Sequence, residues 1–308
     1  MRRLRMKYGM VLAALLLLTA QAAPAQETAP EEAAPEGAWN VTSEFNVTLT
    51  QNAYSENWSG SESGSVSWAV NSNSLAEKQL TPSLHSATSL ELAFGQTHSQ
   101  DPETKDWLRP AKSTDLIDLE SVLRFTRGWA VDPFASGRVE SQFLDERNPE
   151  SRRTFNPVKL TESVGVARDL IQEENRELSM RLGGALRQHI DRYSPLEEGD
   201  GTETVTTRDA GVEFVTEYRS QISEGKIGLE SRLRAYNALY DSEEDKEGPE
   251  DGSDDWKSVD VDWENRLTAN VTDYLMVNLY VQLLYDKEID DDVMFKETLA
   301  LGFSFQLL

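Results

Sequence analysis

The sequence LALGFSFQLL, residues Leu299–Leu308, alternates apolar side chains with small or polar ones. Because successive side chains of a β-strand point to opposite faces of a sheet, this alternation predicts a strand with one fully apolar face. The surrounding chain carries a formal net charge of -24 and has a mean hydropathy of -0.54, so this apolar strand contrasts with its context. The apolar positions are Leu299, Leu301, Phe303, Phe305 and Leu307.

The same period of two runs through the rest of the chain. Between Leu275 and Tyr285 every second side chain is apolar, and Asn278 and Gln282 lie on the opposite face. About twelve such segments are present, and single-chain bacterial barrels have an even number of strands. The others centre on Phe45–Leu49, Val66–Val70, Leu90–Phe94, Ile117–Phe125, Val139–Phe143, Leu160–Val166, Leu178–Ile190, Val212–Tyr218, Ile227–Leu239 and Val259–Leu267.

Two folds contain strands of this kind, namely a soluble β-sandwich and a closed barrel in a membrane. The polar faces here carry charges of both signs, which suits a barrel lumen. Most segments reach the roughly 9–11 residues that a tilted strand needs to cross a bilayer. Aromatic residues near the predicted strand ends fit the girdles found at membrane interfaces. These are Trp39, Trp68, Trp129, Trp263 and Tyr285.

The connections between the predicted strands alternate in length, as expected for short periplasmic turns and long outer loops. One connection disagrees, because the polar stretch Asn73–Ser83 falls where a turn is expected and reads as a long loop. Lys287–Asp292 is also shorter than the other outer loops. The short turns are Arg127–Trp129, Gln172–Asn175, Ser223–Gly225 and Asn270–Asp273, and the long loops are Thr97–Ser113, Glu146–Asn156, Arg192–Glu203 and Asp241–Asp255.

The sequence therefore predicts an all-β protein, a closed antiparallel up-and-down transmembrane β-barrel of about 12 strands in residues 39–308. The last strand should pair with the first, because the outer-membrane lipid bilayer supplies no hydrogen bonds to an open edge. A soluble periplasmic β-rich binding module is the alternative. The acidity of the chain argues against a nucleic-acid partner, because nothing in it could neutralise phosphates.

The first residues predict export. Arg2, Arg3 and Arg5 precede an apolar run, Met10–Ala20, which is too short to cross a bilayer comfortably. Residues 1–25 are expected to be a cleavable signal peptide, and residues 26–38 a disordered periplasmic leader. The predicted location is the cell outer membrane. The sequence contains no cysteine, so stability must come from burial and hydrogen bonding without a disulfide.

The segment Leu299–Leu308 also resembles the C-terminal assembly signal of bacterial outer-membrane barrels, in which a glycine precedes alternating apolar or aromatic positions. The resemblance implies recognition of this strand by the barrel assembly machinery. Leu308 stands where an aromatic residue is commonest. The residues that carry the resemblance are Gly302, Phe303, Phe305, Leu307 and Leu308.

A second resemblance covers most of the predicted barrel. The stretch Leu49–Asn73 is similar to the opening hairpin of a domain-of-unknown-function family of predicted outer-membrane barrels. Val131–Phe143 and Phe155–Ala167 look like family strands that begin at an Asn/Asp-Pro pair. The resemblance implies fold and location, and it implies no activity. The matching residues of the hairpin are Gln51, Asn57, Trp58 and Gly60.

The polar faces of the predicted strands would line the lumen with acids and bases, which we expect to form cross-strand pairs. The interior is then either a self-satisfied charged core or a narrow water-filled channel, so the role is a small passive diffusion channel or an envelope structural protein. The lumen-lining residues are Glu120, Arg124, Arg138, Glu140, Arg181, Arg187, Glu213, Glu230, Arg232, Arg234, Asp260, Asp262, Glu264 and Arg266, together with Glu91 and Asp118.

Two acidic outer loops, Asp241–Asp255 and Asp286–Asp292, should lie close together at the rim. Carboxylates can bind divalent cations, but their spacing here does not match an EF-hand loop, so a solvated acidic surface is expected. A weak cation screen against anionic lipid headgroups is the alternative. No metal site and no cofactor is predicted.

An enzyme would require a catalytic group, and no catalytic residue is predicted. His189 and Asp191 share one face of a strand near its outer end, which leaves a rim-located barrel hydrolase as an alternative. Their Cα atoms would lie about 7 Å apart, from the rise of a strand, and the sequence holds no G-x-S-x-G motif.

Overall fold

The computed structural model describes residues 38–53, 63–147, 152–193, 203–223, 225–242, 254–272 and 275–306. The predicted signal peptide (1–25) and all of the leader except residue 38 lie outside these residues. No helix in the described part of the chain is long and apolar enough to span a membrane. The strands are β1 (Asn40–Asn52), β2 (Ser65–Thr81), β3 (Leu84–Ser99), β4 (Ala111–Arg124), β5 (Asp132–Ser141), β6 (Val158–Glu173), β7 (Arg176–Tyr193), β8 (Glu203–Ile222), β9 (Ile227–Asp241), β10 (Val259–Asn270), β11 (Leu275–Tyr285) and β12 (Met294–Gln306), with a short 3-10 helix, η1 (Asp254–Lys257), before β10.

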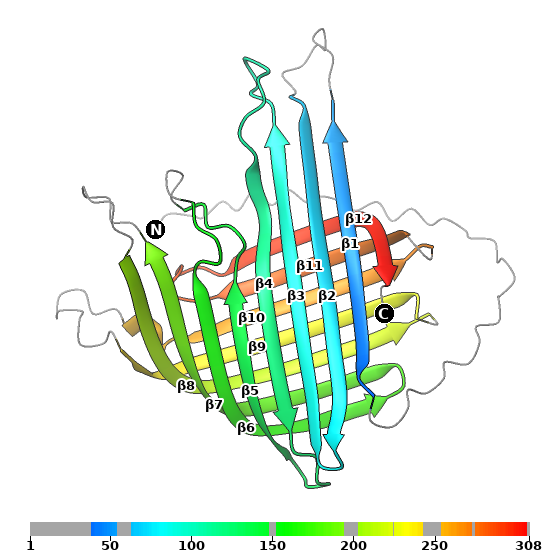
Figure 1. Ribbon diagram of the computed structural model, residues 1–308, viewed down its shortest axis with the longest axis vertical. Helices are drawn as coiled ribbons and strands as arrows, with labels where there is room; N and C mark the ends of the chain where they lie inside the picture. The colour runs from blue at the N-terminus through cyan, green and yellow to red at the C-terminus, as the bar shows by residue number, and fades with distance from the viewer. Residues whose placement is uncertain are drawn as a thin grey trace, which may run out of the picture. The chain divides into compact units, whose positions relative to one another are not determined.

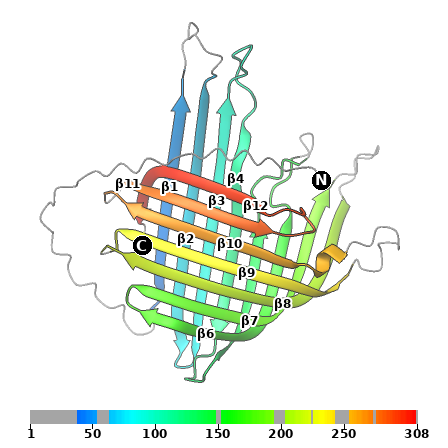
Figure 2. The same ribbon diagram turned by 180° about the vertical axis from the view of Figure 1, so that it is seen from behind.

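The twelve strands form one closed antiparallel barrel in which each strand pairs with its neighbours in the chain. β1 pairs with β12 and closes the ring, as the sequence predicts. Figures 1 and 2 show the wall formed by β1–β4 crossing steeply over the wall formed by β9–β12. Strands on opposite sides of a barrel cross in this way because all of them tilt in the same sense around its axis. The predicted all-β, twelve-stranded fold is confirmed.

The strand register places charged side chains on one face of the wall and apolar side chains on the other. Glu264 of β10 lies opposite Arg232 of β9 and faces inward, whereas Leu267 lies opposite Leu229 and faces outward. Outward-facing leucines and valines are left uncovered, and Leu182, for example, is 51% exposed. In water such a surface would be unfavourable, because each Å² of apolar area costs about 25 cal/mol.

The polar stretch that the sequence predicts to be a long loop belongs mostly to β2. β2 continues to Thr81 and β3 begins at Leu84, so the connection in Asn73–Ser83 is a tight turn at Pro82 and Ser83. The loop prediction was wrong because the outward positions of β2 lose their apolar residues over this stretch, which removes the alternation. The residues at these outward positions are Ser72, Ser74, Ala76 and Lys78.

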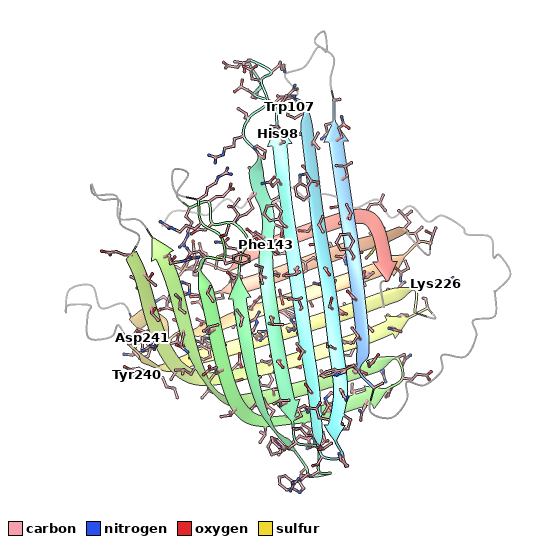
Figure 3. All side chains as sticks on the ribbon, viewed as in Figure 1. His98, Trp107, Phe143, Lys226, Tyr240 and Asp241 are labelled. Carbon is pink, nitrogen blue, oxygen red and sulfur yellow. The ribbon has the colours of Figure 1, made fainter. Side chains whose placement is uncertain are left out.

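The connections alternate between the two ends of the barrel. Lys226, in the short β8–β9 turn, directly precedes β9, and Asp241 ends β9 beside the longer β9–β10 connection; Figure 3 places these two residues at opposite ends of that strand. With the β2–β3 turn corrected, the predicted short connections lie at one end of the strands and the predicted long ones at the other. The acidic loop residues 243–253 lie outside the described residues.

Glycines allow β6, β7 and β8 to approach their neighbours closely. A Cβ atom on Gly165 would lie 2.1 Å from the backbone oxygen of Leu182, and one on Gly211 would lie 2.1 Å from that of Asn237. A Cβ atom on Gly183 would lie 3.2 Å from the ring of Phe134, which is 5% exposed. The missing side chains therefore leave room for backbone and for an aromatic ring inside the barrel.

Candidate functional site

A central ion-pair cluster reaches across the lumen from Glu120 of β4. Its two carboxylate oxygens lie 2.8 Å from Arg181 of β7 and 2.6 Å from Arg234 of β9. All three side chains are at least nine-tenths buried. In the barrel order β4 is separated from β7 by two strands and from β9 by four, so the contact with β9 joins walls that nearly face each other.

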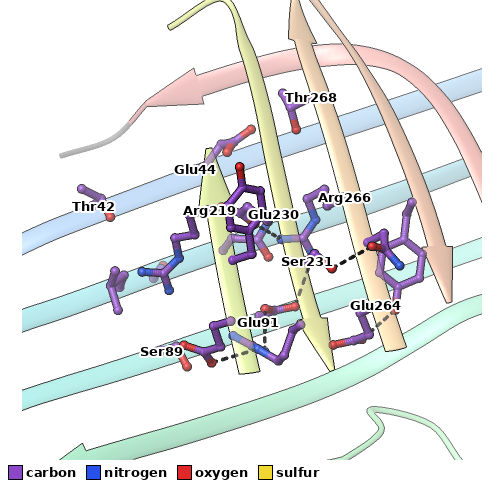
Figure 4. A pocket seen from close by; sticks show the side chains of 18 of the residues that line it. Thr42, Glu44, Ser89, Glu91, Arg219, Glu230, Ser231, Glu264, Arg266 and Thr268 are labelled. Carbon is purple, nitrogen blue, oxygen red and sulfur yellow. Dashed lines mark hydrogen bonds and ion pairs between the residues drawn. The ribbon is translucent and has the colours of Figure 1, made fainter. Parts of the chain in front are cut away.

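A second cluster crosses the lumen from Glu91 of β3. Glu91 lies 3.4 Å from Arg232 of β9 and 3.2 Å from Arg266 of β10. Arg232 also contacts Glu217 at 3.2 Å, and Arg266 contacts Glu230 at 3.2 Å. Figure 4 shows Glu91, Glu230 and Arg266 converging within one pocket. A single carboxylate on β3 thus connects to the two strands of the opposite wall.

A third contact group lies toward the long-loop end of the barrel. Arg187 of β7 pairs with Asp260 of β10 at 2.7 Å, and its guanidinium group lies 3.3 Å from the ring centroid of Tyr236. The hydroxyl of Tyr236 donates a hydrogen bond to Asp209 of β8. Tyr236 is 2% exposed, so its ring fills lumen space beside the ion pair.

Other charges pair along the wall. Arg138 of β5 donates two hydrogen bonds, of 2.8 and 2.7 Å, to Asp118 of the adjacent β4. Glu140 lies 3.0 Å from Arg138 on the same strand. Arg124, near the short turns, lies 2.8 Å from Asp132 and 2.9 Å from Asp169.

The remaining predicted lumen residues have neutral partners or are simply buried. Asp262 accepts a hydrogen bond of 2.8 Å from Gln282, and Glu264 accepts one of 2.7 Å from the hydroxyl of Tyr280. Glu213 is 8% exposed. Tyr236 and Tyr280 also line the lumen, and alternation alone indicates this, because they share the inward faces of β9 and β11 with polar residues.

Two cavities, of about 450 and 470 Å³, lie on the short-turn side of these clusters. Gln221 and Asn270 line the first, and Thr126 and Gln172 line the second, and all four residues lie next to short turns. Arg232 lines both cavities. The interior therefore contains a polar space at one end that is bounded by the ion-pair clusters.

Asp191 holds the β5–β6 connection in place. Its carboxylate accepts two 2.8 Å hydrogen bonds from Arg147 and one of 2.9 Å from Asn156. Asn156 is 1% exposed and also donates to Asp145. The bond from Arg147 holds the pKa of Asp145, in the β5–β6 connection, well below its usual range. A His189–Asp191 catalytic pair would need the carboxylate oxygens of Asp191, and these already accept hydrogen bonds from Arg147 and Asn156.

The predicted assembly-signal residues lie in or just beyond β12. Phe303 lies opposite Val47 of β1, and Phe305 lies opposite Phe45. Leu307 and Leu308 lie outside the described residues. Among the described residues, no group of three or more His, Asp or Glu side chains is placed to hold a metal ion.

A family model described as "Protein of unknown function (DUF3078)" matches residues 49–146. The match includes the predicted opening hairpin and the motif Val131–Phe143, so the resemblance is confirmed over that stretch. It ends before Phe155–Ala167, and residues 54–62 of the hairpin, including Asn57, Trp58 and Gly60, lie outside the described part of the chain. No match was found among curated proteins.

Solved structures similar to this chain include a channel and two autotransporter domains. An outer membrane channel from Pseudomonas putida F1 is 15% identical, with 91% of this chain and 99% of that chain covered and a TM-score of 0.40. The translocator domain of the autotransporter NalP from Neisseria meningitidis is 9% identical, with 89% and 90% covered and a TM-score of 0.36. The β domain of the Bordetella autotransporter BrkA is 8% identical, with 87% and 98% covered and a TM-score of 0.32. The fold assignment rests on the strand pairing described above and not on these similarities.

Proposed function

We propose that this chain is an outer-membrane β-barrel that forms a narrow charged channel, which is closed at mid-height by ion pairs crossing its lumen. Export through a cleavable signal peptide and assembly through the C-terminal strand are parts of this proposal. The chain would need no cofactor, because its polar interior alone determines what can pass.

The outer face supports a membrane location. Leu182, Val164 and Leu267 face outward on different strands and are 51%, 65% and 40% exposed. Hydrocarbon would cover such side chains without cost, whereas a soluble periplasmic binding module would expose them to water. This observation favours the membrane barrel over the soluble alternative.

An aromatic chain at the long-loop end fits a membrane interface. The ring centroids of Trp68 and Phe94 are 5.8 Å apart, those of Phe94 and Phe143 are 6.0 Å apart, and those of Phe143 and Phe155 are 6.4 Å apart. Trp68 and Phe94 face outward from β2 and β3, and the other two belong to the β5–β6 connection. Aromatic side chains gather where the hydrocarbon meets the headgroups.

The observation that carries the proposal is the contact of Glu91 and Glu120 with arginines on the opposite wall. Burying ions costs several kcal/mol per group, and replacement by apolar residues is often neutral or stabilising. A barrel selected for stability alone could therefore use apolar side chains here. Charged groups that pair across a polar lumen instead give a constriction that ions and water can pass when the pairs separate.

The test is single-channel conductance of the refolded protein in planar bilayers. We expect small, reproducible steps for the wild type and larger steps for Glu91→Gln, because that change weakens two contacts across the lumen. Glu230→Gln is the matched control, since it removes the same charge from a pair between adjacent strands, β9 and β10. Equal conductance in both variants would contradict the role of the crossing pairs.

An envelope structural protein is the second candidate, and the ion pairs that join opposite walls of the barrel are the observation that favours it. In this case the wild type and Glu91→Gln would both stay silent in bilayers, although each folds into a heat-modifiable barrel. Conductance in either protein would reject the purely structural role.

A further inference from the structure

The junction between β1 and β12 is much shorter than the others in the barrel. These strands share four residue pairs, from Glu44↔Gln306 to Val47↔Phe303. By comparison, β1 and β2 share thirteen pairs, and β11 and β12 share ten. Beyond the pair Val47↔Phe303 the two strands separate, and Figures 1 and 2 show β12 running away from β1.

The separation leaves two strand edges without a neighbour. Residues 48–52 of β1 pair with β2 alone, and residues 294–302 of β12 pair with β11 alone; the structure describes all of these residues. Their outward side chains are exposed, with Leu49 at 69% and Leu299 at 68%. An unpaired edge is costly in hydrocarbon, because lipid offers its backbone groups no hydrogen bonds.

A glycine lies where the strands part. A Cβ atom on Gly302 would lie 2.8 Å from the backbone oxygen of Val47 and 3.0 Å from the side chain of Thr48. The two backbones therefore approach closely at this residue and diverge directly beyond it. Gly302 is placed to act as a pivot for β12.

The free edges have complementary sequences. Continuing the observed register beyond Val47↔Phe303 would bring Leu49 opposite Leu301 on the outer face and Thr50 opposite Ala300 on the inner face. Leu49, Leu299 and Leu301 would then face the lipid together with the polar Gln51, and the small residues Thr50, Ala300 and Gly302 would face the lumen. The two edges can therefore pair without any change of register or of side-chain direction.

We propose that the β1–β12 junction is a lateral seam with two states. In the closed state residues 48–52 pair with residues 298–302, and in the open state β12 swings about Gly302 and the acyl chains of bilayer lipids reach the lumen. This inference rests on the membrane location proposed above, and it does not require that the barrel conducts ions.

Cysteine substitutions test the closed state cleanly, since the chain has no cysteine of its own. Facing residues of paired strands are close enough for a disulfide. In liposomes under oxidant, Thr50→Cys with Ala300→Cys should cross-link, at about one tenth of the control rate if the closed state is populated at roughly 10%. The control is Thr48→Cys with Ala69→Cys, which lie opposite each other in the long β1–β2 pairing. No cross-link in the seam pair, or a rate equal to the control, would overturn the two-state seam.

A maleimide carrying an acyl chain, dissolved in the same liposomes, tests the open state. Ala300→Cys, inward-facing beside the seam, should be labelled, and Ala185→Cys, inward-facing and buried on β7, should not. Leu267→Cys, outward-facing, should be labelled in either state. Labelling of Leu267→Cys without Ala300→Cys would overturn the seam and leave the membrane location intact. Failure to label Leu267→Cys would overturn the membrane location and, with it, the seam.

Discussion

Glu120 shows what one residue does in this interior. Its carboxylate sits between Arg181 of β7 and Arg234 of β9, and β9 lies on the far side of the lumen. Neither arginine can reach water easily, because the side chains are 9% and 8% exposed. The free energy of the barrel at this point depends on one negative charge facing two positive ones.

Replacing Glu120 by glutamine should therefore destabilise the barrel by about 3–5 kcal/mol, since it removes the carboxylate 2.6 Å from the buried Arg234 and leaves the buried Arg181 with the more distant Glu217, at 3.7 Å. Unfolding in urea in the presence of lipid vesicles measures this free energy. Glu230→Gln should cost less than about 1 kcal/mol, because Glu230 is 55% exposed and its pair is screened by solvent. Equal losses in the two variants would show that burial of the Glu120 pairs contributes nothing.

Glu288, in the β11–β12 connection, should make stability depend on pH. Desolvation, followed by the nearby carboxylates of Asp286 and Asp260, raises its pKa to about 7. Between about pH 4.5 and about pH 7 the folded protein therefore holds a proton on Glu288 that the unfolded chain has released. The free energy of unfolding falls as the pH rises through this window, because the unfolded chain binds fewer protons than the folded protein. The melting temperature in detergent should fall across that window, and the fall should be smaller in Glu288→Gln.

The control for this titration is Glu103→Gln, the same acid-to-amide change in the β3–β4 connection. It should leave the slope of melting temperature against pH as in the wild type. If the slope of melting temperature against pH in Glu288→Gln also equals that of the wild type, a group other than Glu288 binds the proton that causes this slope.

At the scale of the strand, a prediction follows from the close backbone contacts of the glycines in β6–β8. Gly211→Ala should destabilise the barrel by about 1–3 kcal/mol, because the new Cβ would lie 2.1 Å from a backbone oxygen that cannot move aside like a side chain. Gly137→Ala on β5 is the matched control, since no atom lies within 4 Å of its added Cβ. Urea unfolding compares the two, and similar midpoints would mean that the strands relax without cost.

The loop anchored by Asn156 gives a second prediction at this scale. Asn156→Ala should leave the carboxylates of Asp145 and Asp191 short of donors, at a cost of about 1–3 kcal/mol. Local opening of the β5–β6 connection should then speed trypsin cleavage after Arg153 by about tenfold or more, as 1.4 kcal/mol corresponds to tenfold. Asn265→Ala, on β10, should leave the cleavage rate unchanged. Unchanged cleavage in Asn156→Ala would show that other contacts hold the loop.

Strands were predictable from the sequence wherever their outward positions stay apolar. β11 has leucine or valine at every outward position from Leu275 to Leu283, and both its existence and its faces follow from that pattern. β2 does not keep apolar residues at its outward positions, so its sequence predicts a loop over the second half of the strand. Local alternation therefore identifies a strand only where both environments, lipid and lumen, act on the sequence.

For the whole molecule, parity indicated which charges face inward but not which of them meet. Adjacent pairs such as Arg138 with Asp118 follow from neighbouring strands, whereas the contact of Glu91 with Arg232 depends on the register and circumference of the closed ring. The engagement of Asp191 by Arg147, from a loop, is likewise a tertiary result. These pairings could not be read from residue spacing because they join strands or loops that are distant in the sequence.

The central claim is that lipid covers the apolar face of this closed barrel while the charged face lines its interior. Nitroxide labels on single cysteines placed in turn at residues 277–283 of β11, in liposomes, test it most directly by their collision with oxygen, which dissolves in lipid. The account predicts a period of two, with high oxygen accessibility at Val277, Leu279, Val281 and Leu283 and low accessibility at Asn278, Tyr280 and Gln282. Uniform accessibility along the strand, or a pattern unchanged when lipid is replaced by buffer, would contradict it.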